Sequence, residues 1–193
     1  MIDLSEYFHK ELDQHREVLE QTKKTIESQF IESVECCKNS IKLGGKIIFF
    51  GNGGSAADAQ HLSTELTVKF SKERKAISAI ALTTDTSTLT AIGNDFGFDK
   101  IFSRQIEALG RPNDTVIAIS TSGKSKNVIE AVKTANSMGI KVVSFTGISG
   151  GKLVELSDVC IQIPTETVSR IQEMHITIGQ MLCNALEKNL GLV

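Results

Sequence analysis

Apolar residues in the first 45 positions recur at the three- and four-residue spacing of an amphipathic helix. Asp3, followed three residues later by Glu6, has the pattern of a capping box at the start of this stretch. The periodic positions are Leu4, Phe8, Leu12, Val18, Leu19, Thr22, Ile26, Phe30, Val34, Cys37 and Ile41. The pattern predicts two helices that end at Gly44-Gly45, and we expect them to cover a sheet or to pack against another subunit.

Beyond residue 45, short β-rich runs alternate with helical segments. The segments are Lys46–Phe50, Ser55–Lys69, Ala76–Leu82, Ser87–Ile92, Phe102–Leu109, Thr115–Ile119, Lys126–Met138, Lys141–Phe145, Val159–Ile163 and Val168–Leu190. This alternation is typical of an α/β fold, in which helices cover both faces of a parallel sheet. We predict a single domain over residues 1–193, with N-terminal helices in 1–45 and an α/β sandwich in 46–193.

Composition narrows the classes of function. Apolar residues make up 40% and charged residues 23%, which is the balance of a soluble globular protein, and no apolar run is long enough to cross a membrane. With a start that does not resemble a signal peptide, we expect a cytoplasmic protein. A formal charge of −2, no tryptophan and one tyrosine argue against a nucleic-acid surface. The four cysteines lack metal-binding spacing, so we expect reduced thiols: Cys36, Cys37, Cys160 and Cys183.

A cluster of hydroxyl side chains is the strongest chemical signal. Ser120-Thr121-Ser122-Gly123-Lys124-Ser125 directly follows the apolar run Val116–Ile119 and precedes a helix expected to begin near Asn127. Hydroxyls, backbone N–H groups and the positive end of a helix dipole would meet at this turn. The sequence therefore predicts a phosphate site here.

A second turn, Gly51-Asn52-Gly53-Gly54-Ser55, follows the apolar run Ile47–Phe50. It has neither the Lys-Ser/Thr ending of a Walker loop nor the GxGxxG spacing, so nucleotide binding is disfavoured. Ser55 is expected to cap the next helix, with Asp58 as its capping-box partner. Ordinary strand–helix geometry explains this turn as well as ligand contact does. Two such turns in one small domain nevertheless imply a shared cleft beyond the carboxyl ends of the strands.

The helix after this turn carries His61 and Glu65, whose spacing of four residues places both side chains on one face. They fit a divalent metal site, a general base at Glu65, or an ordinary surface contact within the helix. Asn94-Asp95 is expected in a polar turn after a helix, where plain turn chemistry is the alternative to ligand contact.

Gln172, Ile176 and Gln180 share roughly one face of the last helix. His175 lies near its apolar side, so we interpret it as a hydrogen-bonded packing residue. We interpret three cationic residues as solvated charges: Lys69, Arg74 and Arg104. Lys69, one helical turn past Glu65, is also placed to help neutralise a phosphate.

Taken together, these motifs resemble the sugar isomerase (SIS) domain, and within it the phosphoheptose isomerases that interconvert sedoheptulose 7-phosphate and D-glycero-D-manno-heptose 7-phosphate. The resemblance covers nearly the whole chain and is most specific in residues 51–61, 91–98, 119–123 and 170–175. It implies an SIS-type sandwich around a mostly parallel sheet of about five strands. It also implies a role in bacterial heptose synthesis for lipopolysaccharide, and a homotetramer with active sites at its subunit interfaces.

The resemblance also implies a role for each matching residue. The phosphate would be held by Ser120, Thr121, Ser122 and Ser125, and the sugar chain would be contacted by Asn52, Gly53, Gly54, Ser55, Asn94 and Asp95. Glu65, as the base, and Gln172 would face the reacting carbons. One zinc ion per subunit would be bound by His61, Glu65, Gln172 and the residue at position 180.

Position 180 departs from the family pattern, which has a histidine where this chain has Gln180. A glutamine amide does not titrate near neutral pH and is a poorer metal ligand, so the resemblance implies low activity and weakened zinc binding. The alternative is a non-catalytic SIS protein resembling the DnaA-binding initiator-associating factor, which lacks the same histidine. Glu65 and the uninterrupted serine turn favour the enzyme. A hexose phosphate substrate stays open, because the sequence does not give the depth of the pocket.

Overall fold

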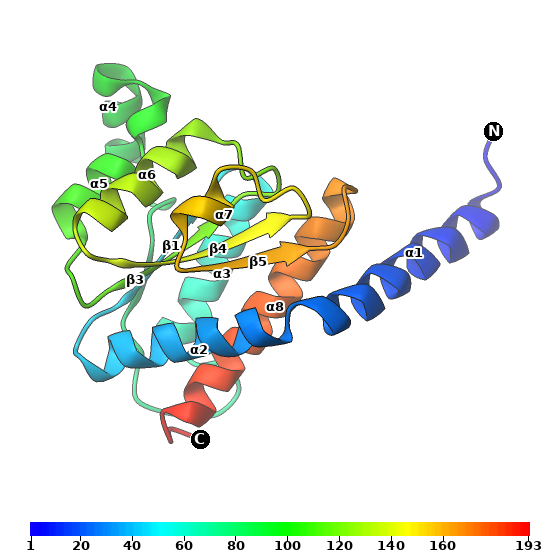
Figure 1. Ribbon diagram of the computed structural model, residues 1–193, viewed down its shortest axis with the longest axis horizontal. Coiled ribbons are helices and arrows are strands. Elements are labelled where there is room, and N and C mark those ends of the chain that lie inside the picture. Colours follow the sequence, from blue (N-terminus) through cyan, green and yellow to red (C-terminus); the bar gives the residue numbers. More distant parts are fainter.

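A five-stranded sheet, parallel throughout, forms the centre of the computed structural model, which describes residues 1–193 (Figure 1). The strands lie in the order β2-β1-β3-β4-β5. Their bounds are Ile47–Gly51 (β1), Ala79–Ala81 (β2), Thr115–Ile119 (β3), Lys141–Gly147 (β4) and Val159–Ile163 (β5). Every residue of β1 and β3 is buried, as the continuous apolar runs of central parallel strands require. The predicted α/β class is confirmed.

Helices cover both faces of this sheet. One apolar core lies between the sheet and α2 (Glu27–Lys42), α3 (Gly54–Thr67) and α8 (Val168–Asn189), with the end of α1 (Leu4–Thr25) at its margin. The other core lies beneath five shorter elements: α4 (Thr86–Phe96), η1 (Phe98–Lys100), α5 (Ser103–Leu109), α6 (Lys126–Ser137) and α7 (Leu153–Leu156). Alternate side chains of each strand enter the two cores, because successive residues of a strand point to opposite faces.

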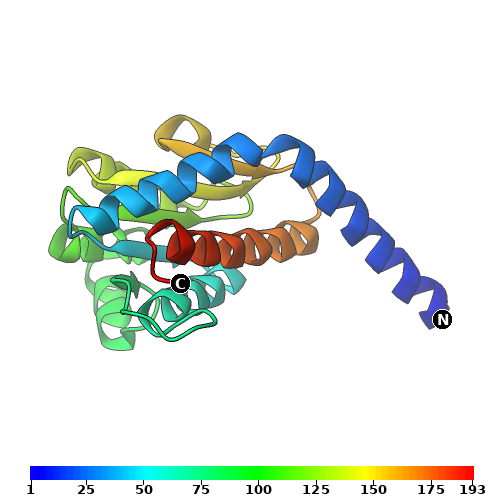
Figure 2. The same ribbon diagram turned by 90° about the horizontal axis from the view of Figure 1, so that it is seen from below.

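The two N-terminal helices form as predicted, with Asp3 as the N-cap that accepts the backbone N–H of Ser5 at 2.9 Å. The chain bends at Ile26, after which α2 packs on the sheet. Most of α1 instead runs away from the body of the molecule (Figures 1 and 2). No helix combines the length and the apolar character needed to cross a bilayer.

Two predicted boundaries were wrong. The strand expected over Ala76–Leu82 is only Ala79–Ala81, an edge strand that pairs with β1 alone. The helix expected over Ser87–Ile92 runs from Thr86 to Phe96, because Asp85 caps its first turn and Gly97, with φ of 86°, ends it.

His175 is the packing residue that the sequence predicted. It is fully buried on α8, its ring lies 5.8 Å from that of Phe145, and its Nε2 stands 3.2 Å from the carbonyl oxygen of Thr146. Since a carbonyl can only accept, the ring carries its proton on Nε2, while Nδ1 has no partner. Burial lowers the pKa of His175 to about 4, only partly opposed by the bond to Thr146.

This burial predicts that the free energy of unfolding decreases as the pH falls from about 6.5 to about 4. The unfolded chain takes up a proton on this ring first, so the loss begins at the unfolded pKa and reaches about 3 kcal/mol at most. Urea unfolding of the wild type and His175→Phe at pH 7, 5 and 4 measures it. The difference in free energy of unfolding between the two proteins should change over this pH range. A constant difference would contradict the lowered pKa of His175.

Candidate active site

The serine turn, residues 120–125, joins β3 to α6 with Ser125 at the N-cap position of the helix. Ser120 is buried, and its hydroxyl lies 3.3 Å from that of Ser125. The hydroxyl of Ser122 accepts the backbone N–H of Lys124 at 3.2 Å. Hydroxyls therefore gather at the positive end of α6, as the sequence predicted, and this arrangement suits an anion.

Backbone contacts with the loop after β4 fix the shape of the serine turn. Gly147 donates its N–H to the carbonyl of Thr121 at 2.9 Å, and Lys152 donates to the carbonyl of Gly123 at 3.2 Å. Gly123 has φ of 61°, and a Cβ there would stand 2.0 Å from the carbonyl oxygen of Gly150. Only glycine fits this position. A cavity of about 280 Å³ opens beside the turn, lined by Thr121, Ser122, Lys124, the loop after β4 and the start of α8.

The glycine turn, residues 51–55, enters its helix one residue earlier than predicted. Gly53, with φ of 55°, is the N-cap of α3, and Ser55 is already helical, with its N–H bonded to the carbonyl of Asn52 at 3.0 Å. Ser55 is therefore not the cap and makes no capping-box pair with Asp58, because the glycine conformation turns the chain first. Asp58 is half-buried, and burial raises its pKa.

Asn127 joins the two turns, and sequence reasoning assigned it no role. Its amide group and that of Asn52 exchange two hydrogen bonds, of 2.8 and 2.9 Å. Asn127 is 2% exposed, and its Oδ1 also accepts the backbone N–H of Val128. The only signal in the sequence is an asparagine at the start of the helix after the serine turn. The paired amides therefore hold the glycine turn against the serine turn, and the contact of Asn52 with the sugar chain stays a prediction.

His61, Glu65 and Gln180 form one cluster between α3 and α8. The Nε2 of His61 lies 3.0 Å from both Glu65 Oε1 and the side-chain nitrogen of Gln180, which also donates to Glu65 Oε1 at 3.3 Å. One ring nitrogen faces two groups, so the cluster has two hydrogen-bond arrangements. The side chain of Glu65 is 20% exposed and that of His61 54%, so the carboxylate is sheltered but reachable.

A small residue on α8 allows this contact. A Cβ at Gly179 would stand 2.5 Å from a methyl group of Leu62, so a larger residue there would displace the Leu62 side chain or push the two helices apart. Gln180 follows Gly179 directly and reaches Glu65 across the contact. Backbone proximity thus explains how the predicted His61–Glu65 face of α3 meets Gln180 of α8.

Gln172 lies apart from the cluster. Its side-chain nitrogen would stand 2.8 Å from a Cβ at Gly54, so it lies beside the glycine turn at the start of α3. No hydrogen bond joins it to the cluster of His61, Glu65 and Gln180. The structure therefore brings together three of the four residues predicted to bind metal.

Asn94 and Asp95 lie in the last turn of α4, not in a turn after a helix, so that prediction was wrong. Both are exposed and hydrogen-bond to each other, with Asn94 Nδ2 2.8 Å from Asp95 Oδ1. The threonine-rich segment after β2 continues as helix up to Gly97, which moves the pair to the end of α4, at the top left of Figure 1.

Comparison with known proteins identifies the family. Residues 11–147 match the SIS domain family. A phosphoheptose isomerase of Paramagnetospirillum magneticum is 51% identical over 181 residues, which cover 94% of each chain. The chain belongs to the phosphoheptose isomerase family. A family member from Helicobacter pylori strain P12 is 45% identical over 99% of this chain and 98% of its own.

Solved structures of phosphoheptose isomerases share the fold over almost the whole chain. That of Neisseria gonorrhoeae is 40% identical, with a TM-score of 0.91, and covers 96% of this chain and 100% of its own. That of Francisella tularensis is 32% identical, with a TM-score of 0.93, and covers 97% and 100%. The predicted SIS-type sandwich is therefore confirmed as the fold of a phosphoheptose isomerase family member.

The paired amides predict a measurable coupling between Asn52 and Asn127. Either single change to alanine leaves a buried or partly buried amide without its partner and should cost about 1–3 kcal/mol of stability. The loss of stability in the double variant should be smaller than the sum of the two single losses, by about 1 kcal/mol or more. Denaturant unfolding of all four proteins checks this. Asn189→Ala, on the distant end of α8, serves as the control partner and should add to Asn52→Ala without coupling; the same additivity for Asn127 would contradict the pairing.

Proposed function

We propose that this protein interconverts sedoheptulose 7-phosphate and D-glycero-D-manno-heptose 7-phosphate, a step of bacterial heptose synthesis for surface polysaccharide. Membership in the phosphoheptose isomerase family over nearly the whole chain supports the reaction. The carboxylate of Glu65, sheltered between α3 and α8 where it contacts Gln180, is the observation that carries the proposal. We place the protein in the cytoplasm, in keeping with its four free cysteines.

The substrate would lie between the two turns. The hydroxyls of Ser120, Thr121, Ser122 and Ser125 and the start of α6 would hold its phosphate. The backbone N–H groups at Gly53 and Gly54 would face the sugar chain, together with Asn52 and Ser55, and Gln172 lies beside them. The contact proposed for Asn94 and Asp95 stays a prediction, because α4 presents them to the surface.

Moving the carbonyl between C2 and C1 requires a base that removes a proton from one carbon and returns it to the other through a cis-enediol. Glu65 can do both. The oxygens of the enediol also exchange a proton, and imidazole is suited to that step. Gln180 places an amide within reach of Glu65, and an amide can donate a hydrogen bond but cannot take up the proton. We infer that the chain isomerises slowly.

Zinc belongs to the same proposal. An imidazole, a carboxylate and an amide oxygen can each give a lone pair, so the cluster of His61, Glu65 and Gln180 fits a cation. Gln172, the fourth predicted ligand, lies beside the glycine turn and would have to reach toward this cluster to bind the same ion. Only His61 and Glu65 are ligand types that zinc commonly takes, so we expect weak binding. When bound, the ion would polarise the carbonyl of the sugar.

A non-catalytic SIS regulator is not favoured. The relatives compared above are named as isomerases, and the carboxylate and the serine turn are both formed. A scaffold that only binds another macromolecule needs neither.

Gln180→His tests the reaction and the metal together. Restoring a group that transfers protons should raise kcat on sedoheptulose 7-phosphate by about 100-fold, the usual contribution of general acid–base catalysis. Zinc, measured by elemental analysis without chelators, should rise from well below one to near one per chain. Gln180→His/Glu65→Gln is the control and should be inactive. No turnover in either the wild type or Gln180→His would refute the proposed reaction; tight stoichiometric zinc in the wild type would refute the weak site.

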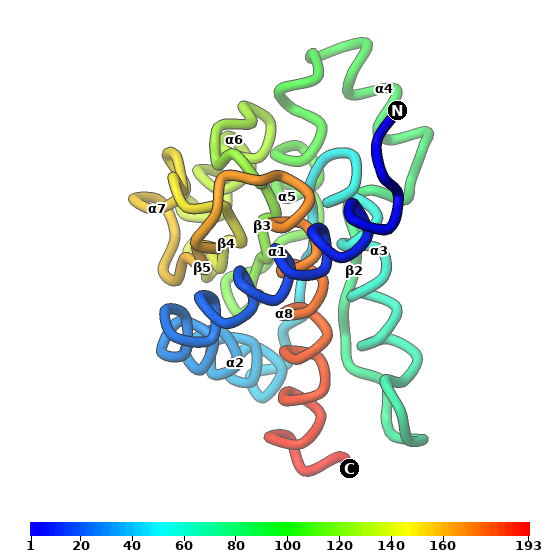
Figure 3. The backbone as a smooth tube through the Cα atoms, turned by 90° about the vertical axis from the view of Figure 1, so that its right-hand side faces the viewer, coloured from blue at the N-terminus to red at the C-terminus, as the bar shows by residue number.

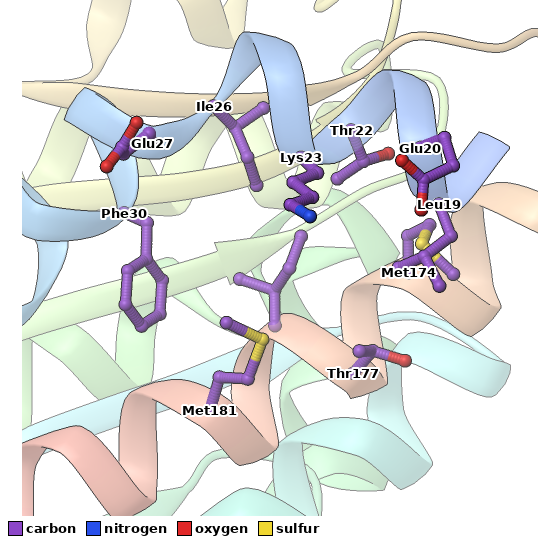
Figure 4. Close-up of a pocket in the computed structure, with 11 residues that line it drawn as sticks. Leu19, Glu20, Thr22, Lys23, Ile26, Glu27, Phe30, Met174, Thr177 and Met181 are labelled. Carbon is purple, nitrogen blue, oxygen red and sulfur yellow. The ribbon is translucent and has the colours of Figure 1, made fainter.

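We further propose that the protein is a homotetramer with its active sites near the subunit interfaces. Large apolar side chains on α1 are exposed, among them Leu4, Tyr7, Phe8 and Leu12. An apolar groove of about 580 Å³ opens between α1, α2 and α8, with Ile26, Phe30 and Met181 among its lining residues (Figure 4). Exposed apolar patches of this kind are typical of surfaces that a partner covers.

The α1 helix is also tied to the start of α8. Arg170 donates to the carbonyl and the carboxylate of Glu11, at 2.7 and 3.0 Å, and His15 lies 2.7 Å from Glu173. Arg170 and Glu173 flank the turn of α8 that carries Gln172. A subunit that packs on α1 would therefore lie close to the active site.

Phe8→Asp/Leu12→Asp should dissociate the assembly, because it places two charges on the apolar stripe of α1. Light scattering of the wild type should give four times the 21.0 kDa of one chain, and the variant a smaller species. Lys10→Glu, which also changes charge on α1, is the control and should stay assembled. A monomeric wild type at micromolar concentration would rule out the tetramer.

A further inference from the structure

Arg74 and Glu187 form an ion pair in which both side chains are 0% exposed. Arg74 belongs to the segment after α3, and its Nε lies 2.5 Å from Oε1 of Glu187 on α8. The interpretation of Arg74 as a solvated charge was therefore wrong, because the fold closes over a position that reads as polar loop in the sequence. Burying two charges costs solvation energy that their attraction often fails to recover, so stability alone is a weak explanation for this pair.

Arg74 holds the C-terminal end of α3. Its terminal nitrogens donate to the main-chain carbonyls of Glu65 at 2.7 Å and Leu66 at 2.9 Å. Carbonyls in the last turn of a helix lack partners within the helix, and a cation is favourable at this end of the helix dipole. The residue whose carboxylate faces Gln180 is thus also held through its backbone. Arg74 therefore fixes the turn of helix that aims this carboxylate.

Glu187 carries the same constraint to α8. Its Oε1 accepts the N–H of Phe70 at 3.0 Å in addition to the bond from Arg74. Gln180 lies about two helical turns earlier on α8 and hence on roughly the same face. Figure 3 shows α3 and α8 side by side. The ion pair joins the two helices at one end, and the contact between Glu65 and Gln180 joins them further along.

Cys183 lies in the same neighbourhood. Its thiol is buried, with Sγ 3.8 Å from the carbonyl oxygen of Leu62. Burial raises the pKa of this thiol, and the carboxylates of Glu65 and Glu187 raise it further, whereas Arg74 lowers it. Glu65, Glu187 and Arg74 are therefore all close enough to this buried thiol to affect its pKa.

We propose that Arg74 and Glu187 are positioning residues for the isomerase: they fix the register of α3 on α8, and so the place where the Glu65 carboxylate meets the side chain at position 180. Neither touches the substrate. The inference rests on the proposed function, since it concerns the base of that reaction. It predicts that disturbing the pair slows proton removal and leaves phosphate binding intact, because the serine turn belongs to the β3–α6 connection.

Exchange of the substrate proton with solvent deuterium tests this directly, because it reports proton removal even where isomerisation is slow. The purified full chain is incubated with sedoheptulose 7-phosphate in D2O, and NMR follows loss of the proton next to the carbonyl. Arg74→Lys keeps the charge opposite Glu187 but loses the guanidinium fork that reaches two carbonyls. Its exchange rate should fall at least about tenfold, with KM within about twofold of the wild type.

Two further variants separate position from folding. Arg74→Met/Glu187→Met leaves no unpaired charge, so it should fold, with an exchange loss of about tenfold or more. Arg104→Lys changes the half-exposed pair of Arg104 with Glu107 and should exchange at the wild-type rate. Circular dichroism and Tm establish folding at the assay temperature. If either folded Arg74 variant exchanges at the wild-type rate, the positioning role is overturned. If the wild type itself shows neither exchange nor turnover, the proposed function fails and this inference fails with it.

Discussion

The parallel register between β1 and β3 is the constraint on which the placement of the two turns depends. Gly51 pairs with Ile119, so the glycine turn and the serine turn leave the sheet at the same level and the same edge. A side chain at Gly51 would stand 2.7 Å from the carbonyl oxygen of Ile119, which leaves no room for another residue. The amides of Asn52 and Asn127 then close the gap between the turns. A shift of register would separate these groups and reverse the faces of the strand.

The second constraint is the close approach of α3 and α8 at Gly179. It brings a carboxylate, an imidazole and an amide from two helices within hydrogen-bond distance. A buried polar group without a partner costs free energy, so such groups are usually paired. At the end of α3, Oε1 of Glu187 is paired with Arg74, whereas its Oε2 has no partner. The two helices are thus joined by specific polar pairs as well as by the apolar core that they share.

Gln180 makes the contacts that the fold provides at its position, but it cannot transfer a proton. The amide occupies a position from which it contacts both His61 and Glu65, so the geometry of the cluster forms without a histidine there. Hydrogen bonding and proton transfer are different capacities, and an amide has only the first. The fold and the geometry of this cluster therefore form whether or not position 180 carries a group that can transfer a proton.

Much of the fold and part of the site were predictable from the sequence. The α/β class, the two N-terminal helices, the serine turn and the packing role of His175 depend on local periodicity and on which residues lie next to each other, and all were confirmed. The roles of the individual site residues came from family resemblance, and those that the structure does not test stay predictions.

Other features were decided only by the tertiary structure. The burial of Arg74, the pairing of Asn127 with Asn52 and the separation of Gln172 from the cluster each join residues far apart in the chain. The N-cap of α3 at Gly53 depends on a positive φ angle that the amino-acid sequence does not determine. Local pattern fixes which face of an element is apolar, because that is set by spacing along one segment. It does not fix how closely two elements approach, because that depends on packing between them, and the geometry of this site is set by such approaches.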